Sequence, residues 1–404
     1  MHLAELAEER ARRAPTGRCI SDDAVTLTNG EFAARIRSVA GLLAQRGVRR
    51  GDVVATLLPN RVELVLTLFG AWYLGATANP IDPALTDAEV SHRLEDSATH
   101  LVVTDGRRSP TGTADTLDVE ALWRAADPGA ALEFVADRDG LALLIYTGGD
   151  TGRPKGVMLD HTNLESTCAM VVAALGLTGT DHCLLVLPLF HLDSIVVSVL
   201  SPLFAGASTT IAGAFGAGRF FGTVSATRPT YFSALPALYE MLCDLPGSVR
   251  PDTSSVRLAL CVSAPLPAEL VEEFEKRFGL ALIAGYGLTE GTCASTLNPP
   301  GGTSKPGTVG LPLPGQKVAV VGADGSPVPA GELGEVVISG PNVMRGYLNR
   351  PGETAKTVVG GWLRTGDVGR FDEDGYLVLG DRVEDMIIRS EQIDKPTLRS
   401  TDAA

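Results

Sequence analysis

The sequence has no closely spaced cysteines, no excess of basic residues and no long apolar run. Its six cysteines form no C-x-x-C pair, which fits reduced cytoplasmic thiols better than a disulfide framework or a zinc site. Because the formal net charge is −14, the chain would repel a polyanionic backbone, which argues against DNA and RNA as partners. The most apolar stretch, residues 194–207, is shorter than the ~20 residues of a membrane helix and contains Pro202. We therefore expect a cytoplasmic protein without a membrane segment.

Short β-rich runs alternate with helical patterns up to about residue 300. The helical patterns span residues 33–45, 61–74, 163–174 and 267–278. The predicted strands are "DVVATLLP", "HLVVTD", "ALLIYT", "HCLLVLP", "STTIAG", "TYFSAL", "RLALCV" and "ALIAGY". Such alternation predicts an α/β fold, in which parallel sheets carry helices on both faces.

The pattern changes after residue 300. Short runs such as "KVAVVG", "GEVVISG" and "YLVLGD" follow one another with Gly, Pro and Asp turns, and helical periodicity almost disappears. We expect a small β-barrel or sheet over residues 301–384. The last residues are polar and lack an apolar period, so residues 385–404 are expected to be a short hinge remnant and tail.

Residues 146–156, "YTGGDTGRPKG", form a glycine-rich loop with two threonines and Lys155. Glycines let backbone N–H groups approach phosphate oxygens, hydroxyls add donors, and a lysine adds a positive charge. The loop is expected directly before a helix that begins near Thr162. It is not a Walker loop, because G-x-x-x-x-G-K-[ST] is absent. A glycine-rich turn can also be purely structural, so the loop alone does not establish a phosphate site.

The loop resembles the phosphate loop of the acyl-adenylate-forming (AMP-binding) superfamily, which includes acyl-CoA synthetases, nonribosomal-peptide adenylation domains and luciferases. Three further matches follow in that family's order: "GYGLTE" at 285–290, "GWLRTGD" at 361–367 and "DRVEDMI" at 381–387. The resemblance extends through residues 1–393. It implies two parallel-sheet αβ subdomains, layered αβαβα, that form the nucleotide and acyl site within residues 1–300.

The resemblance also implies ATP-dependent, AMP-forming activation of a carboxylic acid by an acid–thiol ligase-like enzyme. The carboxylate would attack the α-phosphorus of Mg·ATP, giving an acyl- or aryl-adenylate and pyrophosphate. CoA or a carrier-protein thiol would be the next acceptor. ATP and Mg²⁺ are therefore the expected cofactors, and the acid remains unassigned.

The matched motifs imply individual roles. Lys155, Thr147 and Thr151 would hold the β- and γ-phosphates, and Thr289 and Glu290 the α-phosphate and Mg²⁺. The catalytic set is Lys155, Thr289, Glu290 and His191, with Glu290 as the metal ligand. The nucleotide-binding set, which includes Tyr286 for adenine and Asp367 with Arg382 for ribose, is Thr147, Gly148, Gly149, Asp150, Thr151, Gly152, Ala264, Pro265, Gly285, Tyr286, Gly287, Asp367 and Arg382.

Each of these residue types also has a structural interpretation. "GYGLTE" could be a strand end followed by a helix cap, and an aspartate after a glycine is common in turns. A lone histidine such as His191 is often a core residue. Leu192, rather than Asp193, stands where amino-acid-activating members hold the amino group, so a simple carboxylic acid is the favoured substrate.

The sequence departs from the family pattern at three places. Gly148 and Asp150 replace hydroxyl side chains, and a carboxylate ~5 Å from phosphate would repel it by ~3 kcal/mol at an effective dielectric of ~20 unless it faces Mg²⁺. Val262 replaces a residue that is commonly glycine in the family and should shorten or reshape the acyl pocket. The C-terminal lid domain is expected to be missing. The alternative is therefore a non-catalytic or split descendant that binds nucleotide or acyl group, or that needs a lid domain in trans.

Overall fold

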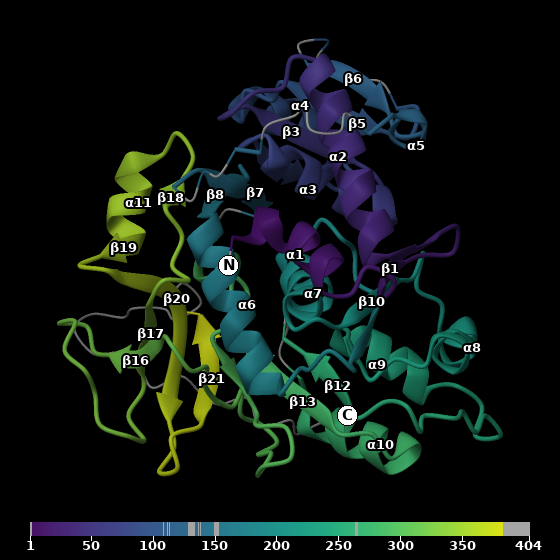
Figure 1. Ribbon diagram of the computed structural model, residues 1–404. Helices are drawn as coiled ribbons and strands as arrows, with labels where there is room; N and C mark the ends of the chain where they lie inside the picture. The colour runs from purple at the N-terminus through teal and green to yellow at the C-terminus, as the bar shows by residue number, and fades with distance from the viewer. Residues whose placement is uncertain are drawn as a thin grey trace.

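The computed structural model describes residues 2–107, 109–110, 112, 114–127, 134–135, 137, 139–148, 153–262 and 266–382, with residues 381 and 382 as backbone only. Three sheets form within these residues. In Figure 1 the seven-stranded sheet lies at the top, the nine-stranded sheet at the lower right and the five-stranded sheet at the left. The expected α/β architecture is confirmed.

The seven-stranded sheet has a parallel centre with an antiparallel hairpin at one edge. Its order is β18 (Gly346–Tyr347), β8 (Lys155–Asp160), β7 (Leu141–Thr147), β4 (Thr77–Pro80), β3 (Val53–Leu57), β5 (Leu101–Thr104) and β6 (Asp115–Asp118). Strands β7, β4, β3, β5 and β6 run parallel, whereas β8 and β18 are antiparallel to their neighbours. The central strands β4, β3 and β5 are almost entirely buried because both of their faces are covered.

The nine-stranded sheet is the second parallel unit. Its order is β15 (Leu311–Pro312), β14 (Thr296–Leu297), β13 (Leu282–Tyr286), β12 (Leu258–Cys261), β11 (Tyr231–Ser233), β9 (His182–Leu185), β10 (Ser208–Ile211), β1 (Arg18–Ser21) and β2 (Thr26–Thr28). The strands from β13 to β1 are parallel, and the edge strands β14, β15 and β2 are antiparallel.

The helices and these two sheets alternate in five layers. One apolar core joins the facing sides of both sheets and takes in α1 (Leu6–Arg13), α2 (Asn29–Gln45), α3 (Val62–Tyr73), α6 (His161–Leu175), the π-helix η3 (Ser194–Leu200) and α7 (Ser201–Phe204). A second core packs α8 (Ala217–Thr227), α9 (Pro236–Cys243) and α10 (Ala268–Phe278) on the outer face of the nine-stranded sheet. A third packs α4 (Asp87–Asp96) outside β3 and β5. The smaller helices are η1 (Leu3–Glu5), α5 (Ala121–Arg124) and η4 (Thr289–Gly291).

A five-stranded antiparallel sheet stands where the small barrel or sheet is expected. It contains β16 (Lys317–Val321), β17 (Gly334–Ser339), β20 (Trp362–Phe371), β19 (Val358–Val359) and β21 (Leu377–Arg382). It begins after β15, which belongs to the nine-stranded sheet, and the intervening β18 pairs with the seven-stranded sheet. Residues 301–384 therefore contribute strands to all three sheets.

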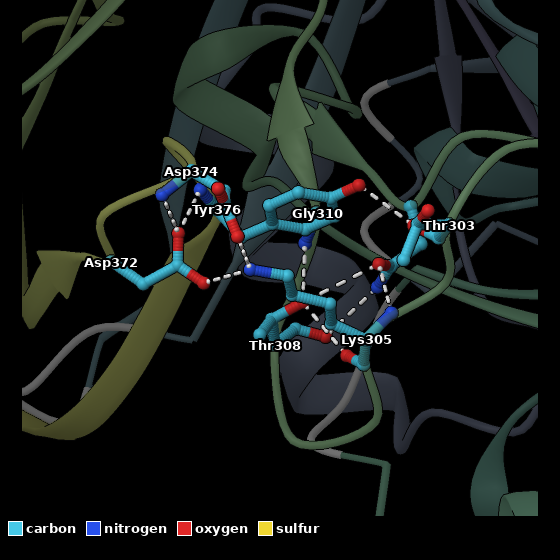
Figure 2. Close-up of polar contacts among 8 residues, drawn as sticks. Thr303, Lys305, Thr308, Gly310, Asp372, Asp374 and Tyr376 are labelled. Carbon is cyan, nitrogen blue, oxygen red and sulfur yellow. Dashed lines mark hydrogen bonds and ion pairs between the residues drawn. The ribbon is translucent and has the colours of Figure 1, made fainter.

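A lysine clamp ties the turn between β20 and β21 to the loop before β15 (Figure 2). Lys305 Nζ lies 2.7 Å from a carboxylate oxygen of Asp372, also pairs with Asp374, and sits 4.6 Å from the ring centre of Tyr376. The Tyr376 hydroxyl donates to the carbonyl of Thr303 at 2.7 Å. The clamp fixes one end of the long hairpin whose first strand carries Asp367.

The structure adds two elements near the matched motifs to the sequence prediction. Strand β8 separates the glycine-rich loop from α6, so the helix expected near Thr162 begins at His161, where Asp160 and Asn163 form a capping box. Helix α11 (Pro351–Thr357) lies in the region expected to lack helices. None of the helices in the described ranges combines the length and the apolar character that crossing a membrane requires.

Candidate functional site

A cavity of about 830 Å³ opens among the carboxyl ends of the parallel strands and the edge of β20. It is bordered by the loops that follow β7, β9, β11, β12 and β13. The carboxyl ends of parallel strands are where open α/β sheets bind ligands. Strand order therefore explains why motifs far apart in the sequence meet in one place.

The cavity brings together most of the described residues that the sequence singled out. The predicted residues that line it are Thr147, Gly148, Lys155, His191, Gly287, Thr289, Glu290 and Asp367. Six others, namely Gly149, Asp150, Thr151, Gly152, Ala264 and Pro265, lie outside the described residues. Arg382 is described by its backbone, which is paired with Asp367 across β20 and β21.

Two predicted glycines have packing roles. A Cβ on Gly287 would lie 1.5 Å from the carbonyl oxygen of Cys293, so only glycine fits there. A Cβ on Gly285 would meet a side-chain atom of Leu297 and the carbonyl of Thr296, both at 2.9 Å. These glycines allow the segment after β13 to fold back on itself and to present Thr289 and Glu290 to the cavity.

Thr147 and Lys155 mark one end of the cavity. They are direct partners in the β7–β8 hairpin that the glycine-rich loop closes. The hydroxyl of Thr147 is buried without a hydrogen-bond partner among the described residues, and a Cβ on Gly148 would meet nothing within 4 Å. A buried hydroxyl without a partner beside open space suits a phosphate oxygen as acceptor.

Glu290 lies beside this end. Its Oε1 accepts a hydrogen bond of 2.8 Å from the hydroxyl of Tyr347, which β18 holds against β8. Burial raises the pKa of Tyr347, and the negative charge of Glu290 adds to the effect, so the phenol stays a donor. Within the described ranges no cluster of three His, Cys, Asp or Glu side chains could hold a metal by itself. A lone carboxylate such as Glu290 suits Mg²⁺, which is commonly held by one or two carboxylates together with substrate phosphates.

Asp367 and Tyr286 are joined directly. The Tyr286 hydroxyl donates to Asp367 Oδ2 over 2.6 Å. The backbone N–H of Asp367 donates to Thr365 Oγ1 at 3.1 Å, after a turn at Gly366 with φ +74°. Asp367 lines the cavity, whereas Tyr286 is buried and is not among the lining residues. Two oxygens of one carboxylate can accept both hydroxyls of a ribose.

The opposite end of the cavity is mainly apolar. Its lining includes Leu187, Pro188, Leu192, Leu235, Val262 and Cys293. Asp193 is the acidic exception: it is 7 % exposed, lines the cavity, and accepts a hydrogen bond of 3.1 Å from Ser233 Oγ. Burial raises the pKa of the Cys293 thiol well above its ordinary value, and the charge of Asp193 raises it further, so this thiol is neutral.

His191 sits at the mouth of the apolar end with its ring against Phe190, the ring centres being 4.5 Å apart. The residue is exposed to solvent at its surface. Nearby protein nevertheless lowers the pKa of His191 by desolvation, and the carboxylate of Asp82 opposes that shift. The histidine is therefore placed at the cavity rather than in the core, and it is mainly neutral at pH 7.

Several cavity residues are absent from the predicted set. Arg364 pairs with Glu335 at 2.9 Å, and both line the cavity together with Lys356 and Tyr347. Arg364 belongs to "GWLRTGD", so that motif contained a signal, whereas Tyr347 and Lys356 lie in "MRGYLNRPGETAK" at 344–356, outside the four matches given above. Which side chains of these motifs face the cavity depends on strand pairings that the sequence does not display.

Comparisons with known proteins show which family the chain resembles over most of its length. The profile of the family described as AMP-binding enzyme matches residues 7–348. Feruloyl-CoA synthase of Amycolatopsis sp is 36% identical over 388 residues, which cover 94% of this chain and 78% of that protein. ATP-bound MatB from Rhodopseudomonas palustris superposes with a TM-score of 0.88 at 29% identity, covering 96% of this chain and 80% of that one. o-Succinylbenzoate CoA synthetase (MenE) from Bacillus subtilis, in complex with the acyl-adenylate intermediate OSB-AMP, gives a TM-score of 0.87 at 29% identity, covering 95% and 78%.

Proposed function

The chain belongs to the AMP-binding enzyme family, and from that premise we propose how its cavity carries out the reaction. The reaction is AMP-forming activation of a carboxylic acid, as in CoA ligases. The observation that supports the proposal is that one cavity gathers groups the reaction needs. It joins a phosphate end at Thr147 and Lys155, the carboxylates of Glu290 and Asp367, and an apolar end.

The nucleotide would lie along the polar end. Lys155 and the hydroxyl of Thr147 would hold the β- and γ-phosphates, and Thr289 the α-phosphate. Asp367 would accept the ribose hydroxyls, with its orientation fixed by Tyr286. Glu290 would hold Mg²⁺, which neutralises charge on the transferring phosphate. These assignments rest on geometry and on the matched motifs.

The chemical step is a displacement at the α-phosphorus. A carboxylate oxygen of the acid forms a bond to that phosphorus, while the bond to the bridging oxygen breaks and releases pyrophosphate. The chain contributes by positioning both reactants and by stabilising charge, rather than through a covalent intermediate. We propose that a thiol, with CoA as the first candidate, then takes the acyl group and displaces AMP.

The apolar end suggests the kind of acid. Val262 is 5 % exposed and narrows the pocket, and Leu192, Leu235 and Cys293 add apolar surface. Asp193 contributes a buried carboxylate that lines this end and accepts a hydrogen bond from Ser233 Oγ. We propose a small or aromatic acid that carries a hydrogen-bond donor, such as a hydroxyl or an amine, away from its carboxylate.

Carboxylate-dependent exchange of pyrophosphate into ATP tests the function. A panel of acids with and without a donor group is assayed, and Lys155→Ala and Asp367→Ala serve as site variants. Exchange with at least one acid, and its loss in both variants, is expected. No exchange with any acid, together with no ATP binding by calorimetry, would overturn the proposal and favour a non-catalytic binding role.

The proposal has two further parts, a lid domain that acts in trans and a location in the cytoplasm. The chain matches 78–80% of the length of the relatives described above, so the exchange assay includes an arm with the remaining C-terminal part of a relative added as a separate polypeptide. Higher turnover in that arm would support a lid domain acting in trans. The six cysteines all lie within the described residues, where they are buried and form no disulfide, which supports the proposed cytoplasmic location.

A further inference from the structure

Lys155 already has an anionic partner within the chain. Its Nζ lies 2.9 Å from Oε2 of Glu353 in α11, and 5.1 Å from the ring centre of Tyr347. The lysine side chain is 17 % exposed and the glutamate side chain 35 %, so water reaches the pair only in part. The group assigned to the phosphates therefore faces a carboxylate in this structure.

A backbone ladder fixes the position of Glu353. Strand β18 pairs with β8 directly before α11, and the N–H of Leu348 donates to the carbonyl of Gly156 at 2.8 Å. The N–H of Arg345 donates to the carbonyl of Met158 at 3.0 Å. Glu353 therefore belongs to a segment that is hydrogen-bonded to β8, the strand that begins with Lys155. Backbone hydrogen bonds thus keep the glutamate close to the lysine.

Arg350 holds the other oxygen of the same carboxylate. Its Nη1 lies 3.0 Å from Glu353 Oε1, and its Nη2 donates to the carbonyl of Pro154 at 3.4 Å. Lys155 and Arg350 together keep the pKa of Glu353 below its usual range, so the carboxylate is charged at neutral pH. Arg350 can retain Glu353 at the edge of the cavity when Lys155 turns to another anion.

We propose that Glu353 is an internal competitor of polyphosphate for Lys155. In the absence of ATP the carboxylate holds the lysine, and the β- and γ-phosphates of ATP displace it. After the adenylate forms, recapture of Lys155 by Glu353 favours departure of pyrophosphate. This inference rests on the proposed function, because it takes Lys155 as the ligand of those phosphates. Glu353 is thus a positioning residue that acts through Lys155.

The proposal predicts opposite effects on binding and release. Replacement by glutamine removes the charge and keeps the shape, and a partly exposed ion pair changes an equilibrium by up to about fivefold. Glu353→Gln should therefore bind inorganic pyrophosphate with Mg²⁺ about three- to fivefold more tightly. AMP affinity should stay unchanged, because AMP lacks the phosphates that reach Lys155. In steady state the KM for ATP should fall while turnover at saturating ATP also falls.

Three variants control for other causes. Glu332→Gln removes the same charge from an exposed glutamate before β17, and pyrophosphate affinity should not move. Glu353→Asp keeps the charge and should stay closer to the wild type than Glu353→Gln. In a Lys155→Ala background, Glu353→Gln should no longer tighten pyrophosphate binding, because the two changes act on one contact. Thermal melting checks that each variant is folded.

The proposed role of Glu353 is wrong if the folded Glu353→Gln variant binds pyrophosphate as tightly as the wild type does, or more weakly. An equal change in AMP affinity also overturns it, because the effect would then be a general rearrangement. The calorimetry is independent of turnover. If the wild type activates no acid but Glu353→Gln still binds pyrophosphate more tightly, the proposed function fails. Competition between Glu353 and pyrophosphate for Lys155 is then still supported.

Discussion

Tyr286 donates its phenolic hydrogen to Asp367 over 2.6 Å, although 81 positions separate the two residues. The bond links the end of β13 in the nine-stranded sheet to β20 in the five-stranded sheet. Two residues that the sequence assigned separately to adenine and to ribose are thus one unit. The phenol orients the carboxylate, and the carboxylate faces the cavity.

Tyr286→Phe should weaken binding of both AMP and ATP by about fivefold. The change keeps the ring and removes one hydrogen bond, which is worth about 1 kcal/mol. Asp367→Ala should cost more, because hydrogen bonds to a charged group are stronger. Calorimetric titration with AMP measures the affinity of both variants. Tyr376→Phe is the matched control, since the Tyr376 hydroxyl donates to the Thr303 carbonyl in the lysine clamp, and AMP affinity should not change. Equal affinities of wild type and Tyr286→Phe would contradict the orienting role.

Gly148→Ser and Gly287→Ala should have opposite consequences. A Cβ at Gly148 meets no atom of the described residues within 4 Å, so serine should fold normally and add a donor that tightens ATP binding by about fivefold. A Cβ at Gly287 would overlap the carbonyl of Cys293 and should lower the melting temperature markedly. Differential scanning calorimetry and ATP titration separate the two effects. A stable Gly287→Ala protein would show that the backbone after β13 can move aside.

Asp193→Asn should change the choice of acid rather than the use of ATP. If the carboxylate accepts a hydrogen bond from the substrate, acids with a donor should lose about tenfold or more in kcat/KM, because hydrogen bonds to charged groups contribute ~1.5–3 kcal/mol. Acids without the donor should be little affected. The KM for ATP should stay the same, since Asp193 lies at the apolar end. Equal losses for both kinds of acid would indicate a structural role for the bond with Ser233.

His182 should make the fold sensitive to acid. Burial lowers the pKa of His182 from 6.5 to about 4, so it stays neutral in the fold while the unfolded chain takes up a proton below pH 6.5. The unfolded state then binds more protons, and stability is lost as the pH falls from about 6.5 to about 4. At about 1.4 kcal/mol per pKa unit the loss is on the order of 3 kcal/mol.

His182→Gln tests this origin. The ring nitrogens contact the hydroxyls of Ser208 and Thr210 at 2.8 and 3.0 Å, which an amide can partly replace. The variant should show a weaker decline of unfolding free energy between pH 6.5 and pH 4. His161, whose pKa burial lowers to about 3, remains as an internal reference for the residual decline. If the unfolding free energy of the variant depends on pH as that of the wild type does, groups other than His182 cause the acid sensitivity.

The main elements of the fold could be predicted because buried parallel strands are continuous apolar runs. Strands such as β3, β9 and β12 have buried residues at almost every position, and the helices around them keep a clear period. Strand β8 was missed because it lies between a glycine-rich loop and a helix, where a short run gives no distinct signal. The two-residue strand β18 has no period at all.

The candidate site was predictable to the extent that its motifs lie at strand ends. Lys155, Thr289 and Glu290 reach one cavity because β7 and β13, the strands that precede them, end there, whereas Asp367 joins them from the middle of β20. The contacts of Lys155 with Tyr347 and Glu353 were not predictable, because they depend on the pairing of β18 with β8. Long-range pairing is a property of the assembled sheet rather than of any local pattern.

The pairing of β18 with β8 also decides when the site is completed during synthesis of the chain. Tyr347 and Val157 are register partners although they are separated by most of the length of the α/β region. A ribosome adds roughly 5–20 residues per second, so about ten seconds or more separate the synthesis of β8 from that of its edge strand. During that interval the nascent chain has its glycine-rich loop but neither Tyr347 nor Glu353 beside Lys155. The phosphate end is completed only when the segment through α11 has emerged, so nucleotide can stabilise the finished protein but not its early folding intermediates.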